Sequence, residues 1–225
     1  MIIRQSTITR DELTHHLSSP ERATQFEQCT FDGEDLSSLE LSGLRFTACS
    51  LAGTSLTRAW LSDTRWESCR LGRADFALAD LTGASFDACD LHMTTWLRAR
   101  MPSVTYTDCK LDGAFFREAQ TLGLTLRQCR LVGADLRGLS FRKQRLEGLD
   151  LSGADLSGCD FRDAVFEGGS LTDANLKVAK FDGADLREAR LGSITVQDLA
   201  LVFKGATISS DQAQQLLSGL GVHVV

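Results

Sequence analysis

Every fifth residue of the chain from Phe26 to Leu201 is apolar, with one threonine in the series and no shift of frame. Of these 36 positions, 20 are leucine and 10 are phenylalanine, and the others are Trp66, Trp96, Met101, Tyr106, Thr121 and Val196. A period of five fits neither an α-helix nor a flat strand. A fixed short period instead indicates a solenoid, in which each turn buries its apolar side by stacking on its neighbours. The chain is therefore expected to offer surfaces rather than a deep pocket.

A longer period of twenty residues sorts the apolar positions into columns. One column holds the aromatic residues Phe26, Phe46, Trp66, Phe86 and Tyr106. The small slot two residues before an apolar position holds all 7 cysteines, and six of them recur at steps of twenty: Cys29, Cys49, Cys69, Cys89, Cys109 and Cys129. Twenty residues are four pentapeptides, so the period predicts four-sided coils with these aromatic and thiol columns in the core.

The repeating units resemble those of the pentapeptide repeat family, whose pattern is Ala, then Asp or Asn, then Leu or Phe, then two variable residues. Units 79–83 (Ala-Asp-Leu-Thr-Gly) and 154–158 (Ala-Asp-Leu-Ser-Gly) match it closely. The resemblance spans residues 26–206. It implies an all-β fold, a right-handed quadrilateral parallel β-helix of about nine coils. At about 4.8 Å per coil the helix is expected to be roughly 43 Å long.

The cysteines are expected to be buried, free thiols. Stacked neighbours about 4.8 Å apart fit the geometry of a disulfide poorly. No Cys-x-x-Cys pair occurs, and the 4 histidines keep no ligand spacing to any cysteine, so neither a metal nor another cofactor is expected. The chain shows no apolar run of membrane-spanning length and no signal-peptide pattern at its start. These features favour the reducing cytoplasm and no contact with a membrane.

Both ends fall outside the frame and are expected to close the solenoid. In residues 1–25, Ile2 and Ile3 suit an edge strand, and Thr9 to Glu12 suit a capping box for a short helix. Residues 207–225 are expected to form a helix followed by a strand. This tail folds back over the last coil or holds two chains together as a homodimer, as in the gyrase-binding members that it resembles. The candidate dimer contacts are Leu216, Leu217, Leu220, Val222 and Val224.

The charge of the repeats is uneven along the chain. Residues 26–115 contain 13 acidic and 8 basic side chains, whereas residues 116–206 contain 13 of each. Four aspartates precede apolar positions of one column and form a candidate acidic side for a partner: Asp35, Asp75, Asp135 and Asp155. Because the chain has a net charge of -6, direct binding of nucleic acid is not expected.

Several large apolar residues fall in outward slots of the middle coils. The candidate contact patch consists of Trp60, Leu78, Leu97, Phe115 and Leu122. Clustered exposed apolar groups usually mark a contact surface. A local loop covering them is the alternative, since Pro102 and Thr121 interrupt the pattern in this stretch.

The chain shows no motif of an enzyme, so it is expected to act by binding. One branch of the family binds DNA gyrase and topoisomerase IV as a mimic of duplex DNA and protects them from poisons. The repeat, the acidic bias and the tail resemble that branch and imply an immunity or resistance protein. A duplex of about 43 Å carries roughly 25 negative charges, far more than these coils. The alternative is an interaction scaffold or effector module with an unrelated protein partner.

Overall fold

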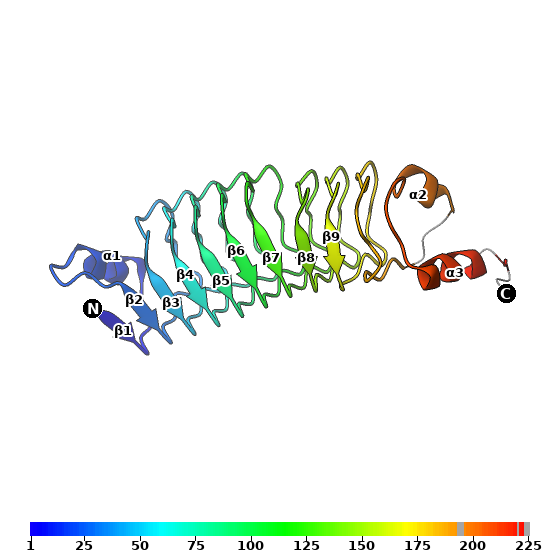
Figure 1. The fold of residues 1–225 in the computed structure, drawn as a ribbon. Helices are drawn as coiled ribbons and strands as arrows, with labels where there is room; N and C mark the ends of the chain where they lie inside the picture. Colours follow the sequence, from blue (N-terminus) through cyan, green and yellow to red (C-terminus); the bar gives the residue numbers. More distant parts are fainter. Residues whose placement is uncertain (193–195, 220, 223–225) are drawn as a thin grey trace. The chain divides into compact units, whose positions relative to one another are not determined.

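A computed structural model describes residues 1–192, 196–219, 221 and 222. The chain forms two compact units, Met1–Cys129 and Arg130–Val225. Figure 1 shows the strands of each unit following one another in chain order. No helix among the described residues is long and apolar enough to cross a membrane.

The first unit is a parallel β-solenoid with four sides. One side carries three-residue strands at steps of twenty: β2 (Gln25–Glu27), β3 (Arg45–Thr47), β4 (Arg65–Glu67), β5 (Ser85–Asp87), β6 (Thr105–Thr107) and β7 (Thr125–Arg127). Each strand pairs in parallel with the next, so that Phe46, for example, lies beside Phe26 and Trp66. Single bridges join the other three sides at the same step, as between Thr30 and Ser50. The predicted coils of twenty residues are therefore confirmed.

The core of this unit contains two aromatic ladders. The predicted column from Phe26 to Tyr106 stacks inward, with ring centroids 4.9 Å apart between Phe86 and Tyr106. A second ladder on another side runs through Phe76, Trp96 and Phe116. The two ladders meet edge to face, as where the Phe86 and Trp96 rings cross at 81°. Such pairs add about 0.5–1.5 kcal/mol each beyond the burial of their area.

Each buried tryptophan has a threonine as its hydrogen-bond partner in the small slot two residues earlier. Trp66 Nε1 donates to Thr64 Oγ1 at 3.0 Å, and Thr64 donates onward to a main-chain carbonyl. Thr94 serves Trp96 in the same way at 2.9 Å. Tyr106 has a valine in that slot, and its hydroxyl is the one buried side-chain polar atom without a partner within the described chain. Burial raises the pKa of Tyr106 well above its usual value.

The six cysteines from Cys29 to Cys129 form the predicted buried column, and all seven cysteines of the chain are free thiols. Their thiols reach main-chain carbonyls of the preceding turn, as where Cys49 Sγ lies 3.4 Å from the carbonyl oxygen of Phe26. Hydrogen bonds between neighbouring thiols, together with burial, raise the pKa of Cys49 and Cys89. The column fills the core without any cross-link.

A strand and a helix cover the first coil. Strand β1 (Ile2–Arg4) pairs in parallel with β2 and extends the sheet by one strand. Helix α1 (Arg10–Ser18) begins with the expected capping box, in which the amide of Thr9 donates to Glu12 Oε2 at 2.8 Å. Leu13 of this helix is fully buried, so the helix covers apolar surface of the solenoid end.

The second unit continues the same kind of repeat. Strands β8 (Arg145–Glu147) and β9 (Val165–Glu167) pair in parallel, with Leu146 beside Phe166. A ladder of Phe141, Phe161 and Phe181 fills its core. Eight strands, β2 to β9, thus mark about eight turns of β-solenoid, one fewer than the nine coils expected from the sequence.

The frame ends earlier than the apolar series suggests, because the chain leaves the solenoid after Leu191. Helix α2 (Val196–Leu201) replaces the last turn, and Leu201 is 72% exposed instead of pointing inward. Phe203 enters the core in its place and packs on Phe181. The inward assignment of Leu201 was therefore wrong, because the frame resumes two residues later and Thr207 pairs with Asp185.

The last helix of the described chain is α3 (Ser210–Gly219). Ser209 caps this helix by accepting from the amide of Gln212 at 3.2 Å. The side chain of Gln212 donates to the carbonyls of Leu186 and Ala189 at 2.8 and 2.7 Å. These bonds fix the start of α3 to the last turn. The expected C-terminal strand falls largely on residues 223–225, which lie outside the described chain.

Candidate partner-binding surfaces

The acidic side predicted for the first unit contains Asp35 and Asp75. They share one outward column, in which Asp35 pairs with Ser55 and Ser55 with Asp75. Asp35 lies 3.8 Å from the guanidinium of Arg10 in α1, and hydrogen bonds from Ser37 lower its pKa. Asp75 accepts from the amide of Ala77 at 2.8 Å and has no ion-pair partner within the described residues. Asp75 therefore retains the less compensated negative charge.

In the second unit, Asp135 and Asp155 are also neighbours in one column, but one arginine offsets part of their charge. Arg137 Nε donates to Asp135 at 2.8 Å and lies 3.6 Å from Asp155. The structure thus weakens the predicted acidic side here, since the arginine offsets charge that the sequence alone counts as free.

The arrangement around Asp135 recurs as an Asp-x-Arg clamp within one pentapeptide. Arg162 holds Asp160 through bonds of 2.9 and 2.7 Å, and Arg187 holds Asp185 in the same way. The hydrogen bond from Arg162 lowers the pKa of Asp160 to about 2. Aspartate and arginine two positions apart are visible in the sequence. The Asp-x-Arg pattern therefore predicts these ion pairs, whereas a count of acidic and basic residues does not.

The apolar patch forms at one corner of the first unit. Here the Leu78 amide donates to the Leu97 carbonyl at 2.9 Å, and Thr95 pairs with Phe115 in the following turn. Trp60 lies across the corner in the preceding turn and is 55% exposed. Leu78 is 39% exposed, whereas Leu97 and Phe115 are half-buried. These four residues form one surface, called the Trp60 patch below.

Leu122 does not belong to this patch. It is 84% exposed, but it lies at the next corner of the coil, where its carbonyl accepts from the amide of Ser103. No loop covers the patch, because the turns from residue 92 to residue 124 keep the twenty-residue step, as where Arg100 pairs with Gln120. The structure therefore brings together four of the five predicted contact residues.

Two arginines beside the Trp60 patch were not anticipated from the sequence. The amide of Arg58 donates to the carbonyl of Ala77, which places Arg58 in the turn directly before Leu78. Arg117 follows Leu97 in its column, since the carbonyl of Arg117 accepts from Arg98. Within the described chain, neither Arg58 nor Arg117 has an ion-pair partner. The twenty-residue step places both beside the patch and was the signal available for them.

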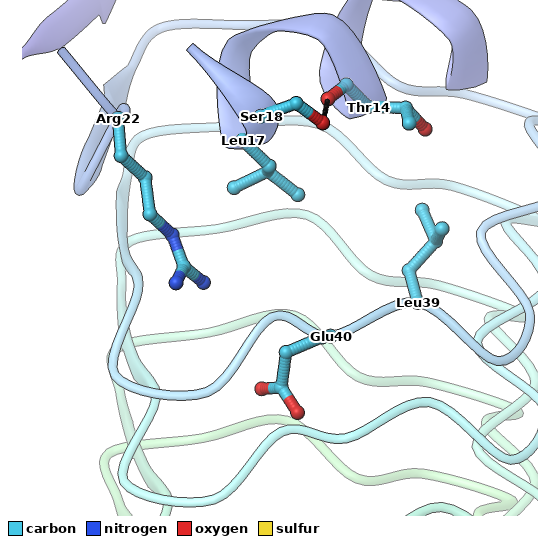
Figure 2. Close-up of a pocket in the computed structure, with 6 residues that line it drawn as sticks. All are labelled: Thr14, Leu17, Ser18, Arg22, Leu39 and Glu40. Atoms are coloured by element: carbon cyan, nitrogen blue, oxygen red, sulfur yellow. Dashed lines mark hydrogen bonds between the residues drawn. The ribbon is translucent and has the colours of Figure 1, made fainter. Parts of the chain in front are cut away.

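A shallow cavity of about 300 Å³ lies between α1 and the first coil. Figure 2 shows Leu17 and Leu39 facing this space, with Arg22 and Glu40 at its side. Ser18 donates to the main-chain carbonyl of Thr14 at 2.8 Å on its helical wall. The cavity is open and its polar groups do not converge on a single point, so it resembles a gap under the cap more than a small-molecule site.

The C-terminal candidate residues are only partly described. In α3, Leu216 is half-buried and Leu217 is 40% exposed, and Val222 beyond the helix is also exposed. Leu220 and Val224 lie outside the described residues. The described part of α3 therefore presents one exposed leucine close to a half-buried one.

A metal site is not assembled in the described part of the chain. No three cysteine, histidine, aspartate or glutamate side chains there come together in a way that holds a metal ion. The histidine with a carboxylate partner is His92, whose Nδ1 lies 2.7 Å from Asp90 at a surface corner. This pair covers the face of Gly72, where a side chain would collide with the imidazole ring, and so packs the turn.

The chain belongs to the pentapeptide repeat family. The model of the pentapeptide repeat region matches residues 22–96 and 99–176. Among solved structures, the chain is similar to full-length QnrB1, which is described as a plasmid-mediated fluoroquinolone resistance protein. The TM-score is 0.62 and the sequence identity is 21%. The match covers 98% of this chain and 97% of that chain. A trypsin-treated QnrB1 variant has a TM-score of 0.58 and 22% identity, covering 100% and 98%. No curated protein sequence matches the chain.

Proposed function

We propose that this protein is a non-catalytic binding protein that docks on DNA gyrase or topoisomerase IV and protects it from a poison. The observation that carries the proposal is the similarity of fold to a fluoroquinolone resistance protein along the whole chain, with both terminal regions included. A role in self-immunity or drug resistance follows from that activity. Buried free thiols suit the reducing cytoplasm, where these enzymes work.

The charge of the first unit supports a contact with a DNA-binding surface. Residues 1–129 contain 17 acidic and 13 basic side chains. An excess of negative charge steers a protein toward the positively charged channel of a DNA enzyme. Since the excess is small compared with that of duplex DNA, shape and individual carboxylates supply most of the specificity. The protein acts as a partial mimic of DNA.

Asp35 and Asp75 are the carboxylates that we assign to this contact. They lie in one column, spaced by two turns. Asp35 has an ion-pair partner in Arg10, Asp75 has none within the described residues, and Asp135 and Asp155 share Arg137. A paired carboxylate offers less to a basic partner, because its attraction to that partner is offset by the neighbouring guanidinium. The contact therefore centres on Asp75 of the first unit, with Asp35 beside the cap.

The test is a gyrase supercoiling assay with a quinolone and with a peptide poison, in which the purified protein is titrated. We expect rescue of supercoiling from at least one poison. Changing both Asp35→Asn and Asp75→Asn should raise the concentration needed by about tenfold, which corresponds to about 1.4 kcal/mol of binding. Unchanged poison sensitivity at tens of micromolar protein would reject the function.

A matched control distinguishes an effect of the Asp35–Asp75 column from an effect of overall charge. The variant Asp63→Asn with Asp108→Asn removes the same charge from other corners of the same unit, where both residues have positive φ and asparagine is tolerated. It should protect as well as the unchanged protein. Equal losses for both variants would show that overall charge matters and that the assigned column does not.

We further propose that two chains associate through α3. The start of this helix is fixed to the last turn by Gln212, while Leu217 remains exposed. An exposed leucine on an anchored helix favours burial against a second copy. Light scattering should give a mass of about 49 kDa, twice the 24.6 kDa of the chain. Leu217→Asp should shift it to the monomer, and a monomeric unchanged protein at high micromolar concentration would contradict the proposal.

A scaffold or effector function with an unrelated protein partner is the second candidate. The Trp60 patch favours it, because a surface made for a DNA-binding channel gains nothing from exposed tryptophan and leucine. The two contacts lie on one side of the coil, since Phe115 of the patch shares an outward column with Asp35 and Asp75.

A further inference from the structure

We infer that the Trp60 patch is a docking site for an amphipathic helix of a protein partner, with leucine-like side chains on one face and acidic side chains beside them. The patch consists of Trp60, Leu78, Leu97 and Phe115, with Arg58 and Arg117 at its border. This inference does not depend on the proposed function, and its test does not involve a topoisomerase.

The residues of the patch differ from the other residues of their columns. Trp60 stands between Glu40 and Asp80 in its column, and the outward column of Phe115 otherwise holds Asp35, Ser55, Asp75 and Thr95. Polar residues suffice at these positions, because the solenoid needs only its inward side chains to pack. Two aromatic side chains in outward columns therefore point to a contact outside the chain.

Leu78 occupies a corner of the coil that does not require an apolar residue. Its φ is 62°, in the left-handed region, and the other members of this corner column share that conformation: Ser38, Arg58, Arg98 and Glu118 in the first unit, and Gly138, Gly158 and Val178 in the second. The corner of the first unit thus accepts serine, arginine or glutamate as well as leucine. The 39% exposure of Leu78 therefore leaves an apolar side chain where a polar one would fold equally well.

The main chain around the patch determines which kind of segment fits it. The main-chain groups around the patch already bond from turn to turn, as between Leu78 and Leu97 and between Trp96 and Phe115. An extended peptide therefore finds no free strand edge to extend. A helix satisfies its own main chain and offers side chains about 5–6 Å apart, close to the spacing of about 4.8 Å between turns. Helix docking is thus favoured over strand addition.

Charge complementarity decides the polar part of the partner. Arg58 and Arg117 border the patch without an ion-pair partner in the described chain, so each can receive a carboxylate. A single-stranded nucleic acid also combines stacking with phosphate contacts. Glu40 and Asp80 on either side of Trp60 oppose a phosphate backbone, whereas a helix places its acidic residues only at the arginines.

Trp60 provides a direct readout of binding. The other two tryptophans, Trp66 and Trp96, are fully buried, so Trp60 is the indole that acrylamide reaches. The probe is a synthetic helical peptide of about four turns without aromatic residues, with leucines along one face and glutamates flanking them. Saturable loss of acrylamide quenching on titration of the full-length protein is the expected result.

Matched variants and probes decide the outcome. Arg58→Glu with Arg117→Glu should weaken binding at least tenfold, and Leu97→Ser with Phe115→Ser should abolish it while circular dichroism stays unchanged. Arg45→Glu with Arg65→Glu, an equal charge change on the strand-bearing side, should leave binding as it was. Three results overturn the inference: no protection of Trp60 at about 1 mM peptide, equal binding of a peptide with lysine in place of glutamate, or protection by a thymidine oligonucleotide but not by the peptide.

Discussion

Replacing Phe86 by aspartate is expected to prevent the protein from folding. The Phe86 ring is buried between Trp66 and Tyr106, with centroids 5.8 and 4.9 Å away, and meets Trp96 edge to face. Aspartate loses these contacts, at about 3–5 kcal/mol for a large aromatic side chain, and buries a charge with no partner. Together, the free energies of the lost contacts and of the buried charge equal much of the unfolding free energy of an ordinary domain. Circular dichroism and the soluble yield of the variant measure the loss.

Two companion variants make this result interpretable. Phe86→Leu, which places in the column the residue found at Leu126 and Leu146, should fold and lose only about 1–2 kcal/mol in urea unfolding. Asp155→Asn lies on the outside, and its isosteric change should shift the unfolding free energy by less than about 0.5 kcal/mol. If Phe86→Asp and Asp155→Asn behaved alike, the assignment of inward and outward positions would be wrong.

A second large effect is expected in thiol chemistry. All seven cysteines are buried, and burial raises the pKa of Cys159 to about 12. At pH 8 such a thiol is about 10⁻⁴ ionised, against roughly a quarter for a free thiol of pKa about 8.5, and only the thiolate reacts. Reaction of Cys159 in the native protein with a disulfide reagent should therefore be at least about 10³-fold slower than that of free cysteine. The other six thiols are also buried, so the reagent should not reach them.

Denaturation supplies the control for this experiment. In guanidinium the same reagent should titrate 7 thiols per chain rapidly. Mass spectrometry then shows whether any cysteine was modified beforehand. One or more thiols that react at the rate of free cysteine in the native protein would contradict the buried column, and fewer than 7 after denaturation would reveal a disulfide.

The solenoid was predictable because its signal is local and repeated. Each pentapeptide places one apolar residue inward, so the polar residue Thr121 does not disturb Phe116 or Leu126 on either side. The end of the repeat was harder to predict, since Leu201 keeps the period by coincidence. The better signal was the shifted unit at 203–206 (Phe-Lys-Gly-Ala), which matches the pattern at 181–184 (Phe-Asp-Gly-Ala) two residues out of frame. The five-residue period alone does not show whether the chain keeps the frame of Leu201 or shifts by two residues to that of Phe203.

The surfaces were less predictable than the core. The sequence located Trp60, Leu78, Leu97 and Phe115, because a twenty-residue step converts position into a side of the coil. The same step places Leu122 at another corner, where the structure also finds it. The ion pair of Asp35 with Arg10 joins the cap to a coil and has no periodic signal. Contacts made by long side chains depend on rotamers, which a repeat pattern does not specify.

The most direct test of the proposed function is an equilibrium binding measurement between the purified protein and DNA gyrase, with duplex DNA as competitor. The account predicts saturable binding that weakens as salt concentration rises and that duplex DNA displaces, because both ligands use the same basic surface. Absence of binding, or binding that an excess of duplex DNA leaves unchanged, would contradict it.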